Sequence, residues 1–225
     1  MIAPVACVIP AYDAAESLPR VIEDVRRSVP HATVIVVDDG SRDRSRDAAA
    51  TAGADALIAF ADNRGKGAAL RAGFAEALGR GMSAVLTMDA DGQHDARRAP
   101  DLLAALERAD IAIGTRDRVP GVMPIGRRIT NALASAAVGR ITGERVDDPQ
   151  SGFRAIRRTV LERVSAEGDR YEFETDFLIR AMEAGFRVTP VAVDTVYGAR
   201  SHFRGLSDSM RVVRCLWRHR SGAPR

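Results

Sequence analysis

The chain has 225 residues, of which 46% are hydrophobic and 28% charged, a size and balance typical of a soluble protein built as one large domain. This composition excludes collagen-like, disordered and disulfide-scaffold proteins. The formal net charge is only +3, and the two cysteines, Cys7 and Cys215, indicate free thiols in a reducing compartment.

The N-terminal segment predicts a strand rather than a targeting signal. Residues 1–9 lack the basic region that precedes the apolar part of a signal peptide. No apolar run in the sequence approaches the roughly 18–20 residues that cross a bilayer. We therefore expect a cytoplasmic protein, with any membrane contact peripheral and at the inner face of the cell membrane.

The first half of the chain alternates short apolar runs with amphipathic stretches. Apolar runs that recur every 20–30 residues with helices between them predict a parallel sheet of βαβ units. Residues 34–37 are continuously apolar, as expected of a strand covered on both faces. The expected strands are residues 5–9, 34–37, 56–60, 84–88 and 111–113, and the expected helices are residues 17–28, 43–52, 67–79 and 97–108.

The second half has a different pattern, which begins with a loop rich in proline and glycine between residues 119 and 126. The elements expected after it are helices at 128–141, 158–164, 173–184 and 206–218 and strands at 152–156 and 187–193. The sequence therefore predicts an α/β fold, in which a mostly parallel central sheet is flanked by helices. We expect this domain to span residues 1–203, followed by a basic, amphipathic helical tail in residues 204–225.

Polar and acidic residues follow several of the apolar runs. Tyr12 follows the first run, Asp39 the second, Asp89 the fourth and Arg116 the fifth. Ligands of open α/β sheets bind beyond the carboxyl ends of the strands. The convergence of these residues on one edge of the sheet therefore predicts a binding site there.

The strongest metal-binding candidate is the pair Asp89 and Asp91, which come directly after a predicted strand. Two carboxylates separated by one residue can both reach one cation, and Mg²⁺ and Mn²⁺ prefer such oxygen ligands. Gln93 and His94 can add ligands or support the carboxylates. The alternative is a solvated turn, which Asp and Gly also favour.

Two further segments have the character of a nucleotide site. Asp38 and Asp39 can accept hydrogen bonds from ribose hydroxyls or base N–H groups, although Asp43 nearby can also simply cap a helix. Residues 63–67 open a helix with Gly65 and Gly67 around Lys66, and a helix N-terminus favours anions. The spacing is not that of a P-loop, and a capped turn is the alternative.

Taken in order, these segments resemble the motifs of family 2 glycosyltransferases, which have the GT-A fold, a Rossmann-like α/β fold. Three more motifs narrow the resemblance to the branch that includes dolichyl-phosphate mannosyltransferase and bacterial polyprenyl-phosphate glycosyltransferases. The resemblance runs from about residue 5 to residue 203. Its motifs are IPAY (9–12), VDDGS (37–41), GKG (65–67), DADGQH (89–94), GTR (114–116), DPQSGFR (148–154) and YEFE (171–174).

The resemblance implies an inverting transferase that uses Mg²⁺ or Mn²⁺ and moves a hexose, of the mannose or glucose type, from a GDP- or UDP-sugar to a polyprenyl or dolichyl phosphate. A bound cation would stabilise the charge that develops on the departing nucleoside diphosphate. By position, the implied nucleotide-sugar residues are Pro10, Tyr12, Asp38, Asp39, Lys66, Asp89, Ala90 and Asp91, and the implied metal ligands are Asp89, Asp91 and Gln93.

The acceptor decides which other groups the chemistry needs. A lipid monophosphate has a second pKa of about 6 and is already anionic, so it needs cations more than a base. The expected cations are Arg116, Arg128, Arg154 and Arg200, although each can also be a solvated surface residue. A hydroxyl acceptor would instead need a carboxylate base, for which the candidates are Asp148, Glu172, Glu174 and Asp176. The residues expected to carry catalysis are Asp91, Arg116, Glu174 and Asp176.

The C-terminal tail is the most basic part of the chain. Residues 200–225 contain seven arginines and one aspartate, and the predicted helix has Leu206, Met210, Val213 and Trp217 on one face. A basic helix with a tryptophan fits an anionic membrane surface. The alternative is that the apolar face packs on the domain.

Other functions stay open at this point. Transfer to a hydroxyl of a glycan, lipid or small metabolite is the main alternative, and a nucleotidyltransferase is a more distant one. Residues 10–13 lack the Gly-rich, basic triphosphate loop that a nucleotidyltransferase uses. No nucleic-acid partner is expected, because acidic residues are interspersed through the domain and no recognition motif is present.

Overall fold

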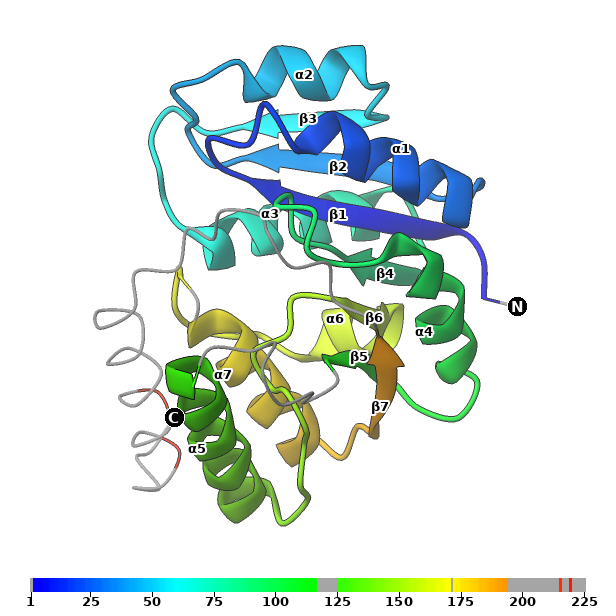
Figure 1. Cartoon of the computed structure of the whole chain (residues 1–225). Helices are drawn as coiled ribbons and strands as arrows, with labels where there is room; N and C mark the ends of the chain where they lie inside the picture. Colours follow the sequence, from blue (N-terminus) through cyan, green and yellow to red (C-terminus); the bar gives the residue numbers. More distant parts are fainter. Residues whose placement is uncertain (1, 117–124, 171, 194–214, 216–218, 220–225) are drawn as a thin grey trace.

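The structure, a computed structural model, describes residues 2–116, 125–170, 172–193, 215 and 219; at 116, 125–130 and 133 it describes the backbone only. The described strands form one sheet of seven in the order β3-β2-β1-β4-β6-β5-β7 (Figure 1). Their bounds are β1 Val5–Ala11, β2 Thr33–Asp38, β3 Ala56–Ala59, β4 Ala84–Thr87, β5 Ile111–Arg116, β6 Arg154–Arg157 and β7 Val188–Val193. The strands expected from the apolar runs are all confirmed, and so is the α/β class.

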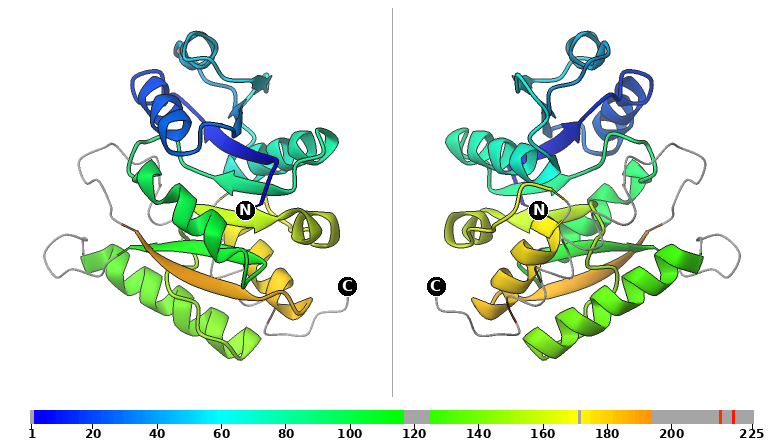
Figure 2. Two further views of the ribbon diagram at one scale, coloured as in Figure 1. Left: turned by 90° about the vertical axis from the view of Figure 1, so that its right-hand side faces the viewer. Right: turned by 90° about the vertical axis from the view of Figure 1, so that its left-hand side faces the viewer.

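Helices cover both faces of the sheet, because the central strands are apolar on both sides. Alternate residues of β1 point to opposite faces, so Cys7 and Ile9 belong to one core and Ala6 and Val8 to the other. The first core is closed by α1 (Leu18–Ser28), α2 (Ser45–Thr51) and α4 (Ala99–Ala105), and the second by α3 (Lys66–Gly79), α5 (Ile125–Thr142), α6 (Arg158–Arg163) and α7 (Glu172–Glu183). Figure 2 shows α1 and α3 on opposite sides of β1.

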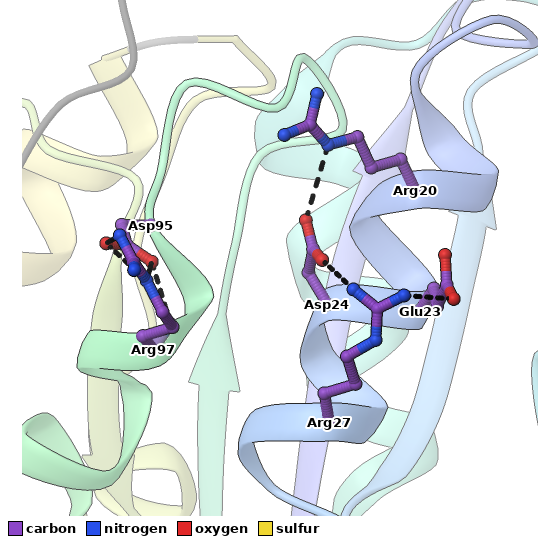
Figure 3. Close-up of polar contacts among 6 residues, drawn as sticks. All are labelled: Arg20, Glu23, Asp24, Arg27, Asp95 and Arg97. Carbon is purple, nitrogen blue, oxygen red and sulfur yellow. Dashed lines mark hydrogen bonds and ion pairs between the residues drawn. The ribbon is translucent and has the colours of Figure 1, made fainter.

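Helix α1 illustrates how the sequence pattern produces this packing. Leu18, Val21, Ile22 and Val25 recur at helical spacing and are all buried. The opposite face carries exposed ion pairs, such as that between Arg20 and Asp24 at 3.6 Å (Figure 3). Exposed pairs of this kind stabilise a helix by only about 0.3–0.5 kcal/mol, so the buried face supplies most of the stability.

One strand runs against the others, and this positions the functional site. β6 is antiparallel to both β4 and β5, with Arg154 opposite Thr87 and Ile113. The start of β6 therefore lies beside the carboxyl ends of β4 and β5. Consequently the loop that leads into β6, residues 148–153, reaches the same edge of the sheet as the acidic strand ends.

The expected tail at residues 204–225 lies largely outside the described residues, as does the proposed boundary near residue 203. Within that tail, Cys215 and His219 are described and both are helical. Among the helices that the structure describes, none combines the length and apolarity needed to cross a membrane.

Candidate functional site

Four side chains from three segments meet at the carboxyl end of β4. Lys66 Nζ lies 2.6 Å from Asp89 Oδ1 and 3.1 Å from Glu174 Oε1. On the other side of Asp89, His94 Nε2 lies 3.2 Å from Oδ2. Lys66 begins α3, Asp89 follows β4 and Glu174 is in the first turn of α7. The structure thus brings together Lys66, Asp89 and Glu174, which were expected at the site for separate reasons.

The two carboxylates of the Asp-Ala-Asp motif have opposite electrostatic environments. Burial alone would raise the pKa of Asp89, but Lys66 and His94 outweigh it and hold that pKa well below its usual value. Burial and the neighbouring charge of Asp89 raise the pKa of Asp91. A divalent cation beside Asp91 would supply the positive charge that favours its ionised form. The donor set therefore fits a hard cation at Asp91.

The loop that carries Asp91 is held by two hydrogen bonds. Ser17 Oγ, just before α1, donates to the carbonyl of Ala90 at 2.6 Å. The backbone N–H of Gln93 donates to Asp91 Oδ1 at 3.0 Å. Gln93, the third expected metal ligand, is half-buried on the same loop, two residues after Asp91. These bonds fix the carboxylate of Asp91 before any ligand arrives.

Gly152 lies against the carboxylate of Asp89, a contact that the sequence did not predict. A Cβ at this position would lie 2.5 Å from Asp89 Oδ2, closer than real Cβ contacts come. Thr87 Oγ1 donates to the carbonyl of Gly152 at 2.7 Å and holds the two segments together. Only glycine allows the loop to approach this closely. The DPQSGFR motif was a sequence signal for the region, but not for this steric role.

The acidic end of β2 holds the turn that precedes α3. Asp39 accepts the backbone N–H groups of Arg64 at 2.7 Å and Gly65 at 2.8 Å, and burial raises its pKa. Asp38 Oδ2 accepts from Arg46 Nε at 2.7 Å, whereas its buried Oδ1 has no hydrogen-bond partner among the described residues. The expected nucleotide residues of β2 therefore also position Lys66.

Pro10 and Tyr12 complete the expected nucleotide side of the site. Pro10 lies within β1 opposite Val37 of β2, and it is buried. Tyr12 follows the strand directly and is half-buried. Both thus lie at the carboxyl end of β1, next to the end of β2.

Arg154, expected to bind an acceptor, has other partners in the structure. The residue is 2% exposed, and its guanidinium donates to the carbonyls of Ser151 at 2.8 Å, Pro149 at 2.7 Å and Glu174 at 2.9 Å. Burial lowers its pKa, opposed by nearby acids of which Glu174 is the strongest. Arg154 thus fastens the loop before β6 to the start of α7. This role differs from the expected contact with the acceptor.

Asp176 also has partners away from Lys66. Its Oδ2 accepts from Arg180 Nε and from the backbone N–H of Glu167, each at 2.7 Å. Glu174 and Asp176 are two residues apart on α7, which turns their side chains to different sides of the helix. Of the two expected catalytic carboxylates, the structure thus brings Glu174 to the cluster and Asp176 to another location.

The remaining expected cations are described less fully. The backbone of Arg116 ends β5 on the same edge of the sheet as Asp89, and the backbone of Arg128 lies in the first half of α5. Arg200 lies outside the described residues. Asp148 and Glu172, the alternative bases, are both buried near this edge.

Comparison with known protein sequences shows the family of this chain. A family model described as "Glycosyl transferase family 2" matches residues 6–165. The undecaprenyl-phosphate mannosyltransferase of Micrococcus luteus is 34% identical over 203 residues, which cover 85% of this chain and 83% of the relative. The polyprenol monophosphomannose synthase of Mycolicibacterium smegmatis is 35% identical over 199 residues, which cover 83% of this chain and 75% of the relative.

A solved structure confirms the fold. Glucosyl-3-phosphoglycerate synthase from Mycobacterium tuberculosis, crystallised with Mn²⁺, UDP and glucosyl-3-phosphoglycerate, aligns with a TM-score of 0.78 at 22% identity. The alignment covers 98% of this chain and 81% of that chain, and it confirms the expected GT-A fold. Because the family model spans more than half of the sequence and the two curated relatives share about a third of their aligned residues with it, the chain is a glycosyltransferase that belongs to family 2.

Proposed function

We propose that this enzyme transfers a hexose, of the mannose or glucose type, from a nucleoside-diphosphate sugar to a polyprenyl phosphate, with Mg²⁺ or Mn²⁺ as cofactor. The observation that carries the proposal is the cluster at the carboxyl end of β4, where Asp89 and Glu174 contact Lys66 and hydrogen bonds hold the loop that carries Asp91. The names of the two curated relatives, an undecaprenyl-phosphate mannosyltransferase and a polyprenol monophosphomannose synthase, support the acceptor.

We place the nucleotide-sugar donor and its cation next to Asp89 and Asp91. Asp91, with Asp89 and Gln93 beside it, would hold the cation, which stabilises the charge of the leaving diphosphate when it is bound. Lys66 begins α3 and adds a positive charge next to Asp89. Pro10, Tyr12, Asp38 and Asp39 lie at the neighbouring strand ends, where we place the nucleoside.

The acceptor half needs positive charge rather than a strong base, because a phosphate monoester is already anionic near neutral pH. Arg116 ends β5 on the edge of the sheet that carries Asp89, so we assign it to the acceptor phosphate. We keep Arg128 and Arg200 as further acceptor cations. Glu174 forms an ion pair with Lys66 and orients its ammonium group. We therefore assign Glu174 the role of positioning Lys66.

A donor and acceptor screen tests the proposal. GDP-mannose, GDP-glucose and UDP-glucose are each incubated with Mn²⁺ or Mg²⁺ and a short polyprenyl phosphate, and the released nucleoside diphosphate is measured. Asp91→Asn should reduce release by on the order of 100-fold or more, because it removes the charge that holds the cation. Asp101→Asn, an exposed carboxylate on α4, is the matched control and should retain activity.

The same screen separates the alternatives. If nucleoside diphosphate is released with hydroxyl acceptors but not with polyprenyl phosphate, the acceptor is a glycan, another lipid or a small metabolite rather than a polyprenyl phosphate. Full activity of Asp91→Asn would reject the metal assignment.

Arg116→Ala should raise the acceptor KM by about 10-fold or more while the donor KM stays near its original value. Arg20→Ala, on the exposed face of α1, should change neither constant.

We further propose that the basic tail brings the enzyme to an anionic membrane, where a polyprenyl phosphate resides. The seven arginines of residues 200–225 each add about 1 kcal/mol of attraction when they lie near such a surface. The protein should therefore sediment with vesicles that contain anionic lipid, less so in high salt. Absence of binding to these vesicles would remove the membrane part of the proposal and leave the transfer reaction untouched.

A further inference from the structure

A second cluster of ligating side chains lies on α7, apart from the residues placed in the transfer reaction. Asp176 Oδ1 lies 2.8 Å from His219 Nε2 and 3.7 Å from Cys215 Sγ. These three atoms all lie within 4.8 Å of one another. Asp176 and Cys215 are almost completely buried, and the His219 side chain is 11% exposed.

The spacing of these residues suits a shared ligand. Cys215 and His219 are both helical and four residues apart, and Cys215 Sγ and a ring nitrogen of His219 lie within 4.8 Å of each other. Asp176 faces them from α7, a different element. One thiol, one imidazole and one carboxylate thus converge from two parts of the chain, and Zn²⁺ accepts each of these three ligand types in proteins.

The groups around the cluster orient each ligand. Arg180 Nε and the N–H of Glu167 occupy Oδ2 of Asp176, so its Oδ1 is directed to the Cys215 and His219 side. The second ring nitrogen of His219, Nδ1, lies 3.6 Å from Glu183 Oε1. Histidines that bind a metal almost always direct their other ring nitrogen to a carboxylate or carbonyl, which fixes the tautomer.

We propose that Asp176, Cys215 and His219 bind Zn²⁺ or another divalent metal with the same preference for sulfur and nitrogen. A thiolate and an imidazole select Zn²⁺ over Mg²⁺ or Mn²⁺, which prefer oxygen ligands. Zn–S and Zn–O bonds of about 2.3 and 2.1 Å at a tetrahedral angle place sulfur and oxygen about 3.6 Å apart. The separation of Sγ and Oδ1 is 3.7 Å.

Binding changes the local bonding in a defined way. The ion binds Nε2 of His219, whose ring then carries its single proton on Nδ1, beside Glu183, and any second ring proton passes to solvent. The Cys215 thiol also loses its proton to solvent as it becomes a ligand. His219 must move by about 0.6 Å, because imidazole nitrogen and carboxylate oxygen around Zn²⁺ lie about 3.4 Å apart, whereas Nε2 and Asp176 Oδ1 are 2.8 Å apart in the structure. A water molecule completes the tetrahedron.

The charges in the described part of the chain favour a dication here. Asp176, Glu183 and a Cys215 thiolate carry three negative charges, and Arg180 offsets one of them. The site would fasten the C-terminal segment to α7, the helix whose first turn supplies Glu174 to Lys66. It thus acts as a structural clamp between two parts of the chain that are 39 residues apart.

Co²⁺ spectroscopy distinguishes this site from the transfer site. The full chain is saturated with Mg²⁺, which occupies the oxygen ligands near Asp91, and is then titrated with Co²⁺. A thiolate bound to Co²⁺ gives a near-ultraviolet charge-transfer band, and tetrahedral coordination gives strong visible bands. We expect both, with one equivalent of Co²⁺ per chain and displacement by Zn²⁺.

Variants decide the outcome. Cys215→Ser should abolish the charge-transfer band and weaken Zn²⁺ binding by 100-fold or more, His219→Ala should weaken it similarly, and Glu183→Gln by about 10- to 100-fold. Cys7→Ala and Asp91→Asn should keep the band. Circular dichroism without metal checks that each variant folds. No band with the unmodified protein, or a band that survives Cys215→Ser, would overturn the proposal and leave a hydrogen-bonded Asp176–His219 pair.

Discussion

Lys66 joins two carboxylates that would otherwise repel each other. Its ammonium contacts Asp89 and Glu174, and its side chain is 14% exposed. Removal of one partner from a buried ion pair is strongly destabilising, because the remaining charge is left without compensation. At the residue scale, the lysine is therefore a structural component of the site as well as a cation near the donor.

Replacement of this lysine should cost both stability and activity. Lys66→Met should lower the free energy of unfolding by about 3 kcal/mol in metal-free buffer, measured by urea denaturation. The double variant Lys66→Met/Glu174→Gln should recover part of that loss, since one of the two carboxylates becomes neutral. Strictly additive effects of the two substitutions would contradict the ion-pair account.

Gly152 should be intolerant of a methyl group for a reason that concerns Asp89. Gly152→Ala places a Cβ 2.5 Å from Asp89 Oδ2, so the carboxylate must move from its place between Lys66 and His94. We expect a loss of transfer activity of about 10-fold or more, since small displacements at a reacting centre are costly. Gly79→Ala, with open space around its Cβ, should leave activity unchanged. Equal kcat/KM values for the two variants would contradict this contact.

Motif spacing predicted part of the site, and geometry supplied the rest. Asp89 and Lys66 were found because both follow recognisable local patterns, a strand end and a glycine-flanked helix start. The burial of Arg154 among three carbonyls could not be predicted, because arginine after a motif also suits a phosphate. The partners of Asp176 include residues 39 and 43 positions away, which no local pattern encodes.

At the element scale, Asp39 connects the end of β2 to the start of α3. It accepts two consecutive backbone N–H groups, those of Arg64 and Gly65. Asp39→Ala should destabilise the protein by about 1–3 kcal/mol, because the buried N–H of Gly65 loses its acceptor. It should also weaken nucleotide binding, since Lys66 follows directly. An unaltered urea midpoint would contradict this role.

The pH dependence of the same contact has a defined sign. Burial raises the folded-state pKa of Asp39 above 3.8, so the folded protein binds this proton more tightly than the unfolded chain. The contribution of Asp39 to stability is therefore largest in acid and declines as the pH rises through the folded-state pKa. Relative to Asp39→Asn, the unmodified protein should lose stability between pH 3.8 and neutrality, as measured by urea titration at several pH values. A gain over that range would contradict the sign.

The elements themselves were largely predictable, but their directions were not. Apolar runs located the strands to within a few residues, because a strand covered on both faces is continuously apolar. The short segment at residues 152–156 was expected to be a strand, and the structure shows that it inserts antiparallel between β4 and β5. Hydrophobic periodicity has no direction, so it could not predict which loop would reach Asp89.

At the scale of the whole molecule, Cys7 reports on global unfolding. It lies in the middle of β1 with no exposed surface, and burial raises the pKa of its thiol to about 12. In the variant Cys215→Ser, Cys7 is the remaining thiol, and a thiol reagent should label it only when the sheet opens. The labelling rate should rise with urea in parallel with global unfolding. Rapid labelling without denaturant would contradict this burial.

The antiparallel insertion of β6 also has a consequence during synthesis of the chain. Thr87, at the end of β4, pairs with Arg154, which is synthesised 67 residues later. At about 5–20 residues per second, the ribosome leaves that edge of β4 without its neighbour for several seconds. An unpaired edge of apolar strand can pair with another nascent chain. During the interval before β6 emerges, slower translation would therefore prolong the exposure of this edge and favour aggregation.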